Sequence, residues 1–123
     1  MTKNYKISEV ARLTNLSIPT LRYYEELGLL QPKRSENNYR LFTKKDLDWI
    51  EFIQKAKNTG MQLSKIIEYS KLREQGITTI NQRIAILEEQ EQLLEFEKRK
   101  LQDHIDFLQA KKAHYHLIKE QNL

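Results

Sequence analysis

The longest uninterrupted stretch of this 123-residue chain runs from Thr79 to about Lys119 and contains neither glycine nor proline. As one helix it would span roughly 60 Å, which is too long for so small a domain to cover. Apolar residues recur along it at heptad spacing, interrupted by Glu91, Lys98 and Lys112. Such a seam needs a partner helix, so we predict a homodimeric coiled coil, parallel or antiparallel. The predicted dimerisation residues are Ile84, Leu87, Leu94, Leu101, Ile105 and Leu108.

Composition favours a mainly α fold in a cytoplasmic protein. Charged residues make up 31% of the chain, as suits long exposed helices, and two prolines with three glycines leave little room for an all-β fold. The absence of cysteine excludes disulfides, thiolate metal sites and thiol redox chemistry. No window reaches transmembrane length, and the N-terminus lacks the apolar run of a signal peptide. We therefore predict no membrane association.

Charge is distributed unevenly between the two parts that the sequence suggests. Residues 1–76 hold 14 Lys/Arg and 9 Asp/Glu, whereas residues 77–123 hold 7 and 8. The basic excess therefore lies in the first part, where a polyanion is expected to bind. We predict a DNA-binding domain at 1–76 and a dimerisation helix with a C-terminal tail at 77–123.

The first part begins with two short predicted helices, at 8–14 and 18–27. Ser8 and Ser17 stand where helix-capping residues are expected, and Gly28 follows the second helix, as a left-handed cap does. Two helices joined by so tight a turn predict a helix-turn-helix, whose second helix commonly enters the DNA major groove.

Residues 35–38 are turn-forming, and residues 39–42 have the composition of a short strand. Together they predict a two-stranded wing that follows this helix pair in the chain. Two further helices are predicted at 44–59 and 63–75, with Thr43 and Asp46 forming a capping box. Trp49 and Phe52 belong to the apolar face of the first of these helices. We predict that they are core residues, with the lining of an effector pocket as the alternative.

Arg22, Tyr23 and Tyr24 follow one another on the second helix, in the segment TLRYYEELGLL. Neighbouring residues on a helix point about 100° apart, so one apolar face cannot bury both rings. Either one ring is core and the other surface, or both belong to a contact surface. Together with the YRLF segment at 39–42, this motif resembles the MerR family of bacterial transcriptional regulators.

The resemblance covers residues 5–119 and implies a winged helix-turn-helix followed by a long helix that dimerises as an antiparallel coiled coil. It implies that Arg22 contacts the DNA backbone or a base edge, and that at least one of the two tyrosine hydroxyls reaches a phosphate. The alternative is that these residues have no role in DNA binding: Arg22 then forms a surface salt bridge with Glu25 or Glu26, and both tyrosines only pack. The implied DNA-binding residues are Thr20, Arg22, Tyr23, Tyr24, Lys33, Arg34, Tyr39 and Arg40.

The sequence leaves the effector unknown and predicts neither a cofactor nor a metal site. Metal-sensing members of the family use cysteines, which this chain lacks, and His114 and His116 point to nearly opposite sides of a helix. The segment 49–61 is similar to the short aldehyde- and thiol-responsive branch, whose cysteine is replaced here by Lys55. A lysine amine condenses with an aldehyde only if its pKa is lowered.

The leading hypothesis is a dimeric regulator that binds and distorts a near-palindromic promoter operator, with RNA polymerase as a partner by family analogy. The alternative is a small architectural DNA-bending factor of the excisionase kind, which the long seam disfavours. The sequence contains no recognisable nucleophile–base pair and no phosphate-binding glycine loop, so it does not indicate an enzyme. A coiled-coil adaptor that binds only proteins would leave Arg22 and Arg40 without a purpose.

Overall fold

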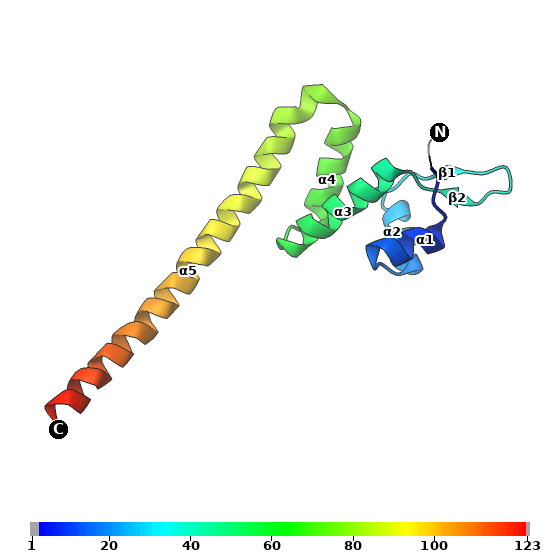
Figure 1. The fold of residues 1–123 in the computed structure, drawn as a ribbon. Helices are drawn as coiled ribbons and strands as arrows, with labels where there is room; N and C mark the ends of the chain where they lie inside the picture. Colours follow the sequence, from blue (N-terminus) through cyan, green and yellow to red (C-terminus); the bar gives the residue numbers. More distant parts are fainter. Residues whose placement is uncertain (1–2, 123) are drawn as a thin grey trace. The chain divides into compact units, whose positions relative to one another are not determined.

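The computed structural model describes residues 3–122, which are mainly helical and fall into two compact units, one ending at Ile86 and the other beginning at Leu87. The mainly α fold is therefore confirmed. In chain order the elements are α1 (Ile7–Thr14), α2 (Ile18–Glu26), β1 (Lys33–Arg34), β2 (Arg40–Leu41), α3 (Lys44–Asn58), α4 (Leu63–Glu74), the short 3₁₀ helix η1 (Ile77–Thr79) and α5 (Ile80–Gln121) (Figure 1).

The helix boundaries follow the predicted capping signals with one correction. The Ser17 hydroxyl accepts a hydrogen bond from the Thr20 N–H, and Thr43 forms a capping box with Asp46. Ser8, in contrast, lies inside α1, because the chain is already helical at Ile7. The backbone N–H that precedes this helix, at Lys6, donates to the Glu9 carboxylate at 3.1 Å. An acidic side chain in the first turn thus replaces the serine cap that the sequence suggested.

The core of the first unit joins both helix pairs. Val10, Leu21, Ile50, Ile53 and Ile66 come from four different helices, and each is at most 1% exposed. The remaining buried apolar residues are Tyr24, Leu29, Leu30, Phe42, Trp49, Ala56, Met61 and Ile86. Phe52 is only half-buried, so the prediction that it is a core residue holds for Trp49 but not for Phe52.

The predicted wing is present, with strands of only two residues each. β1 and β2 pair antiparallel, with Lys33 opposite Leu41 and Arg34 opposite Arg40. The predicted strand 39–42 is shortened at its start because Tyr39 belongs to the turn, where its N–H donates to the Ser35 hydroxyl. At its other end, Phe42 leaves the hairpin and forms a bridge with Tyr5 near the N-terminus.

Helix α5 has 42 residues, and its first turns belong to the first compact unit. Thr79 and Ile86 are buried there, and the Thr79 hydroxyl donates to the Leu72 carbonyl. This compact unit ends at Ile86, whereas the boundary at residue 76 was predicted from function and stays a prediction. Within the second unit, the predicted seam residues Leu94 and Leu101 are 44% and 62% exposed. No helix in the described part of the chain is long and apolar enough to cross a membrane.

Candidate nucleic-acid interface

Helix α2 separates the two tyrosines onto different faces. Tyr24 is 2% exposed and belongs to the core, whereas Tyr23 is 49% exposed. Pro19, Arg22 and Glu26 are also exposed and share one face with Tyr23, because they are three or four positions apart on the helix. Of the two arrangements that the sequence left open, one core ring and one surface ring is the observed one.

Tyr24 keeps a polar function at the edge of the core. Its hydroxyl oxygen accepts a hydrogen bond from the Lys57 ammonium of α3 at 3.1 Å. A phenol that accepts one hydrogen bond can still donate its own proton. Lys57 and the Tyr24 hydroxyl thus place two donors side by side. Sequence analysis missed Lys57 because it lies 33 residues from Tyr24 and no local pattern connects them.

The alternative expected for Arg22, a salt bridge to Glu25 or Glu26, is not what the structure has. Within residues 3–122 no ion pair is formed by Arg22, and its side chain is exposed. Glu25 pairs with other arginines instead. Thr20 lies in the first turn of α2, where its hydroxyl is 2.7 Å from that of Ser17, so its side chain already takes part in the helix cap.

The carboxylate of Glu25 joins α2 to the wing. One of its oxygens, Oε1, accepts from Arg34 Nη2 at 3.0 Å, and the other, Oε2, accepts from Arg40 Nε at 2.6 Å. Arg34 also donates to the Asn38 carbonyl at 3.4 Å. Such charge-assisted hydrogen bonds are about twice as strong as neutral ones. Because β1 and β2 are so short, the two ion pairs of Glu25 are what fixes the hairpin against α2.

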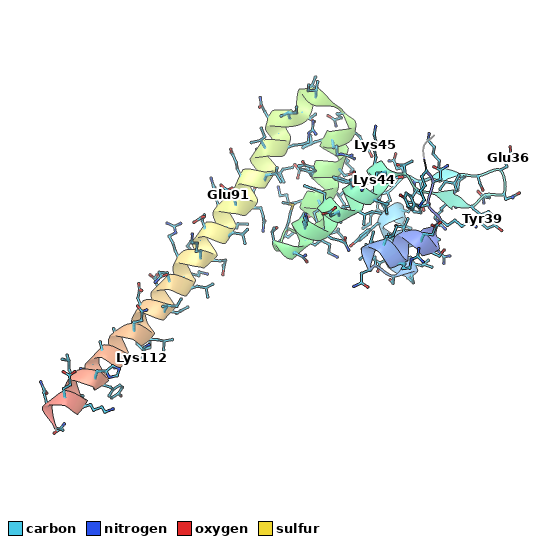
Figure 2. The ribbon with its side chains drawn as sticks, viewed as in Figure 1. Glu36, Tyr39, Lys44, Lys45, Glu91 and Lys112 are labelled. Carbon is cyan, nitrogen blue, oxygen red and sulfur yellow. The ribbon has the colours of Figure 1, made fainter. Side chains whose placement is uncertain are left out.

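The other two predicted wing residues carry no such restraint. Tyr39 is 65% exposed and lies with Glu36 at the loop end of the hairpin, away from the helices (Figure 2). Lys33 is exposed on β1. The structure therefore brings Arg34 and Arg40 together at Glu25 and leaves the side chains of Tyr39 and Lys33 accessible. Arg22 and Tyr23 form a separate exposed face on α2.

Lys55, which stands at the cysteine position of the resembling branch, is a poor candidate for aldehyde chemistry. Its ammonium lies 2.8 Å from the Glu51 carboxylate, and the side chain is 74% exposed. The hydrogen bond to Glu51 and the negative charge of this carboxylate raise the pKa of the Lys55 amine above its ordinary value. A raised pKa keeps the amine protonated, whereas condensation with a carbonyl needs the neutral form.

No metal centre is formed by the residues described. Nowhere between residues 3 and 122 do three histidine, cysteine, aspartate or glutamate side chains gather closely enough to hold an ion. His104, His114 and His116 are all exposed on α5.

Comparison with known proteins identifies the family. The model of the MerR HTH family of regulatory proteins matches residues 5–78, which include α1, α2, the wing, α3 and α4. The protein belongs to this family. MerR HTH proteins are transcriptional regulators, so membership decides in favour of the regulator and against an architectural DNA-bending factor.

Two curated relatives and one solved structure match the chain over most of its length. An uncharacterized HTH-type transcriptional regulator of Bacillus subtilis, YyaN, is 35% identical, and the alignment covers 95% of both chains. AdhR of the same organism is 39% identical over 72% of this chain and 64% of its own. Among solved structures, HiNmlR, a MerR family regulator lacking the sensor domain and bound to promoter DNA, matches with a TM-score of 0.75 and 33% identity, covering 95% of this chain and 94% of its own.

The substitution Glu25→Gln tests the link between α2 and the wing in this MerR HTH protein. An amide cannot form ion pairs with Arg34 and Arg40, so the hairpin should open more often. Partly exposed ion pairs contribute up to about 1 kcal/mol each, so amide exchange across residues 33–41 should accelerate about tenfold. Hydrogen–deuterium exchange read by mass spectrometry measures this. Glu26→Gln changes a neighbouring exposed carboxylate and should leave exchange in the wing unchanged; equal effects of the two variants would contradict the link.

Reductive methylation with formaldehyde tests the reactivity of Lys55. Since Glu51 raises the Lys55 pKa, this amine should react no faster at pH 8 than the exposed Lys71. Glu51→Gln removes the cause of the shift, which increases the neutral fraction of the amine, so methylation of Lys55 should become faster. Peptide mass spectrometry over time measures both rates. Preferential methylation of Lys55 in the unchanged protein would show that it is activated after all.

Proposed function

We propose that the protein binds a near-palindromic promoter operator as a homodimer and distorts the DNA. The observation that supports this most strongly is the α2 surface, where Arg22 and Tyr23 are exposed and Arg22 has no ion pair within the described residues. The wing is fixed beside α2 by Glu25. A relative bound to promoter DNA supports the same mode of action.

The two parts of the surface have different tasks in this proposal. The α2 helix enters the major groove, where Arg22 contacts a base edge or the backbone, with Thr20 and Tyr23 beside it. The wing contacts phosphates through Lys33, Arg34, Tyr39 and Arg40. Because Glu25 already neutralises part of the charge of Arg34 and Arg40, these two arginines serve mainly to hold a fixed geometry, and the exposed Lys33 and Tyr39 contact the DNA backbone.

Tyr24 contributes from below this surface. Its hydroxyl accepts from Lys57, so its proton is free to point at a phosphate oxygen, and the Lys57 ammonium is a second donor to the same group. Burial of the ring keeps the hydroxyl in place. In this way the core residue of the tyrosine pair also fulfils the role that the family resemblance implied for one of them.

Dimerisation is proposed to use the exposed seam of α5. Ile84, Leu87, Leu94, Leu101, Ile105 and Leu108 are each 41% or more exposed in the single chain. Exposed side chains of this size at heptad spacing are stabilised by burial against another helix. A second copy in antiparallel orientation, as in the family, supplies that helix. The proposed division of labour is DNA binding by residues 1–76 and dimerisation by 77–123, with RNA polymerase as a further partner by family analogy.

DNA binding is tested by fluorescence anisotropy with the DNA upstream of the protein's own gene and a scrambled duplex, at several salt concentrations. Arg22→Ala should weaken binding to the upstream DNA by about tenfold or more. If Arg22 contacts a base, the variant should lose its preference for upstream over scrambled DNA. If Arg22 contacts a phosphate, the affinities for both duplexes should fall, and the slope of log affinity against log salt concentration should become about 1 less steep.

Lys71→Ala is the matched control for the DNA experiment, because it removes one exposed positive charge from α4, outside the proposed surface. Its affinity should equal that of the unchanged protein. Equal weak binding to both duplexes, with Arg22→Ala and Lys71→Ala behaving alike, would leave only a generic basic surface and reject the proposed operator recognition.

The dimer is tested separately by sedimentation equilibrium at micromolar concentration. Leu101→Lys places a charge in the seam and should shift the protein from dimer to monomer, since burying an unpaired ammonium is costly. Ala110→Lys adds the same charge on the opposite side of α5 and should remain dimeric. A monomeric unchanged protein, or equal behaviour of both variants, would contradict the seam.

A further inference from the structure

A surface hollow of about 490 Å³ lies in the first compact unit, apart from the proposed DNA-binding surface. Its walls come from α3, α4 and the start of α5. A volume of this size lies within the range of about 300–1,000 Å³ typical of small-molecule sites. The proposed DNA binding and dimerisation do not use this hollow, but two of its residues, Trp49 and Phe52, are those for which the sequence left the lining of an effector pocket open. Its residues nevertheless combine two features that together indicate a particular class of ligand.

The first feature is an aromatic platform formed by Trp49, Phe52 and Tyr69. The ring planes of Trp49 and Phe52 are within 9° of parallel and their centroids are 5.1 Å apart. Tyr69 stacks on Phe52 at 4.9 Å and on Trp49 at 6.1 Å. Phe52 and Tyr69 are only half-buried and both line the hollow, so part of the platform remains open to a further flat ring.

The second feature is an excess of positive charge without matching acceptors. Arg73 lies over the Trp49 ring, 4.4 Å from its centroid. Arg83 donates one hydrogen bond through Nη2 to the Gly76 carbonyl at 3.0 Å, but its Nε is buried and has no hydrogen-bond partner. Lys45 is exposed at the rim, where α3 begins (Figure 2). Within the described residues, none of these three cations forms an ion pair with a carboxylate.

The acidic residue of the hollow does not cancel this charge. Asp48 lines the same hollow, and its carboxylate is 3.0 Å from the Lys44 ammonium. Arg73 is exposed and Arg83 is partly exposed where they line the hollow, so their guanidinium groups offer donors to a ligand that brings acceptors. Carboxylates match the planar fork of guanidinium donors, because their two oxygens accept two parallel hydrogen bonds.

We propose that this hollow binds a small aromatic carboxylate. The ring of the ligand stacks on the open part of the platform at Phe52 and Tyr69. Its carboxylate accepts hydrogen bonds from the guanidinium groups of Arg73 and Arg83, with Lys45 adding charge at the rim. This proposal rests only on the geometry of residues 45–83 and does not depend on DNA binding. Ligand binding can therefore be disproved while the proposed DNA binding holds, and DNA binding can be disproved while ligand binding holds.

Trp49 is the single tryptophan of the chain, so its fluorescence reports on the site directly. The purified full chain is titrated with sodium benzoate in a buffer free of phosphate and other carboxylates, with excitation at 295 nm. Benzamide has the same ring without the charge, and cyclohexanecarboxylate has the charge without the aromatic ring. Benzoate should change the Trp49 emission in a saturable way, and both analogues should bind about tenfold more weakly or worse.

The variants separate binding from folding. Arg83→Gln and Arg73→Gln should each weaken benzoate binding by about tenfold, whereas Lys71→Gln, an exposed position on α4, should bind as the unchanged protein does. Because Arg83 also holds the Gly76 carbonyl, far-UV circular dichroism checks the fold of that variant, and Arg73→Gln gives the answer if Arg83→Gln does not fold.

Three results would overturn the proposal. The first is that benzoate produces no saturable change of emission in the unchanged protein. The second is that benzamide binds as tightly as benzoate, or that the two arginine variants that fold bind as tightly as the unchanged protein. The third is that the Trp49 emission changes with protein concentration and not with benzoate, which would assign the hollow to contact with a second copy of the chain.

Discussion

The ion pairs of Glu25 with Arg34 and Arg40 connect the two halves of the candidate DNA-binding surface. A hairpin with two residues in each strand is too short to keep its place by backbone pairing alone. It is held on one side by this carboxylate and on the other by the bridge between Tyr5 and Phe42. The position of the wing relative to α2 therefore depends on a few polar contacts made outside the hairpin itself.

The aromatic residues of the first unit are divided between two roles by their place on the helices. Tyr24 and the Trp49 indole are almost completely buried, and each still makes a hydrogen bond, with Lys57 and with the Leu29 carbonyl. Tyr23 and Tyr39 remain exposed, next to the cationic residues of the interface. Buried aromatic rings with satisfied polar groups supply rigidity, and exposed ones supply contact area. The same residue type thus serves the core and the candidate interface.

The chemistry available for sensing differs from what the resembling branch suggests. At position 55 an exposed lysine paired with Glu51 stands where that branch has a reactive cysteine, and its raised pKa opposes carbonyl chemistry. The hollow beside Trp49 instead offers stacking surface and guanidinium donors, which favour reversible binding. The site proposed at the hollow would therefore recognise its ligand without covalent chemistry at position 55.

The sequence by itself determined the features that depend on residues close to one another in the chain. These are the helices that end at glycines, the Ser17 and Thr43 caps, and the long α5 with its heptad seam. These follow from spacing within one or two helical turns, which is visible in one dimension. Only the tertiary structure decided that Glu25 binds Arg34 and Arg40 rather than Arg22, that Lys57 reaches Tyr24, and that Arg83 lines the same hollow as the aromatic platform. Those contacts join residues far apart in the chain, and no local pattern encodes them, because packing of the whole unit sets their distances.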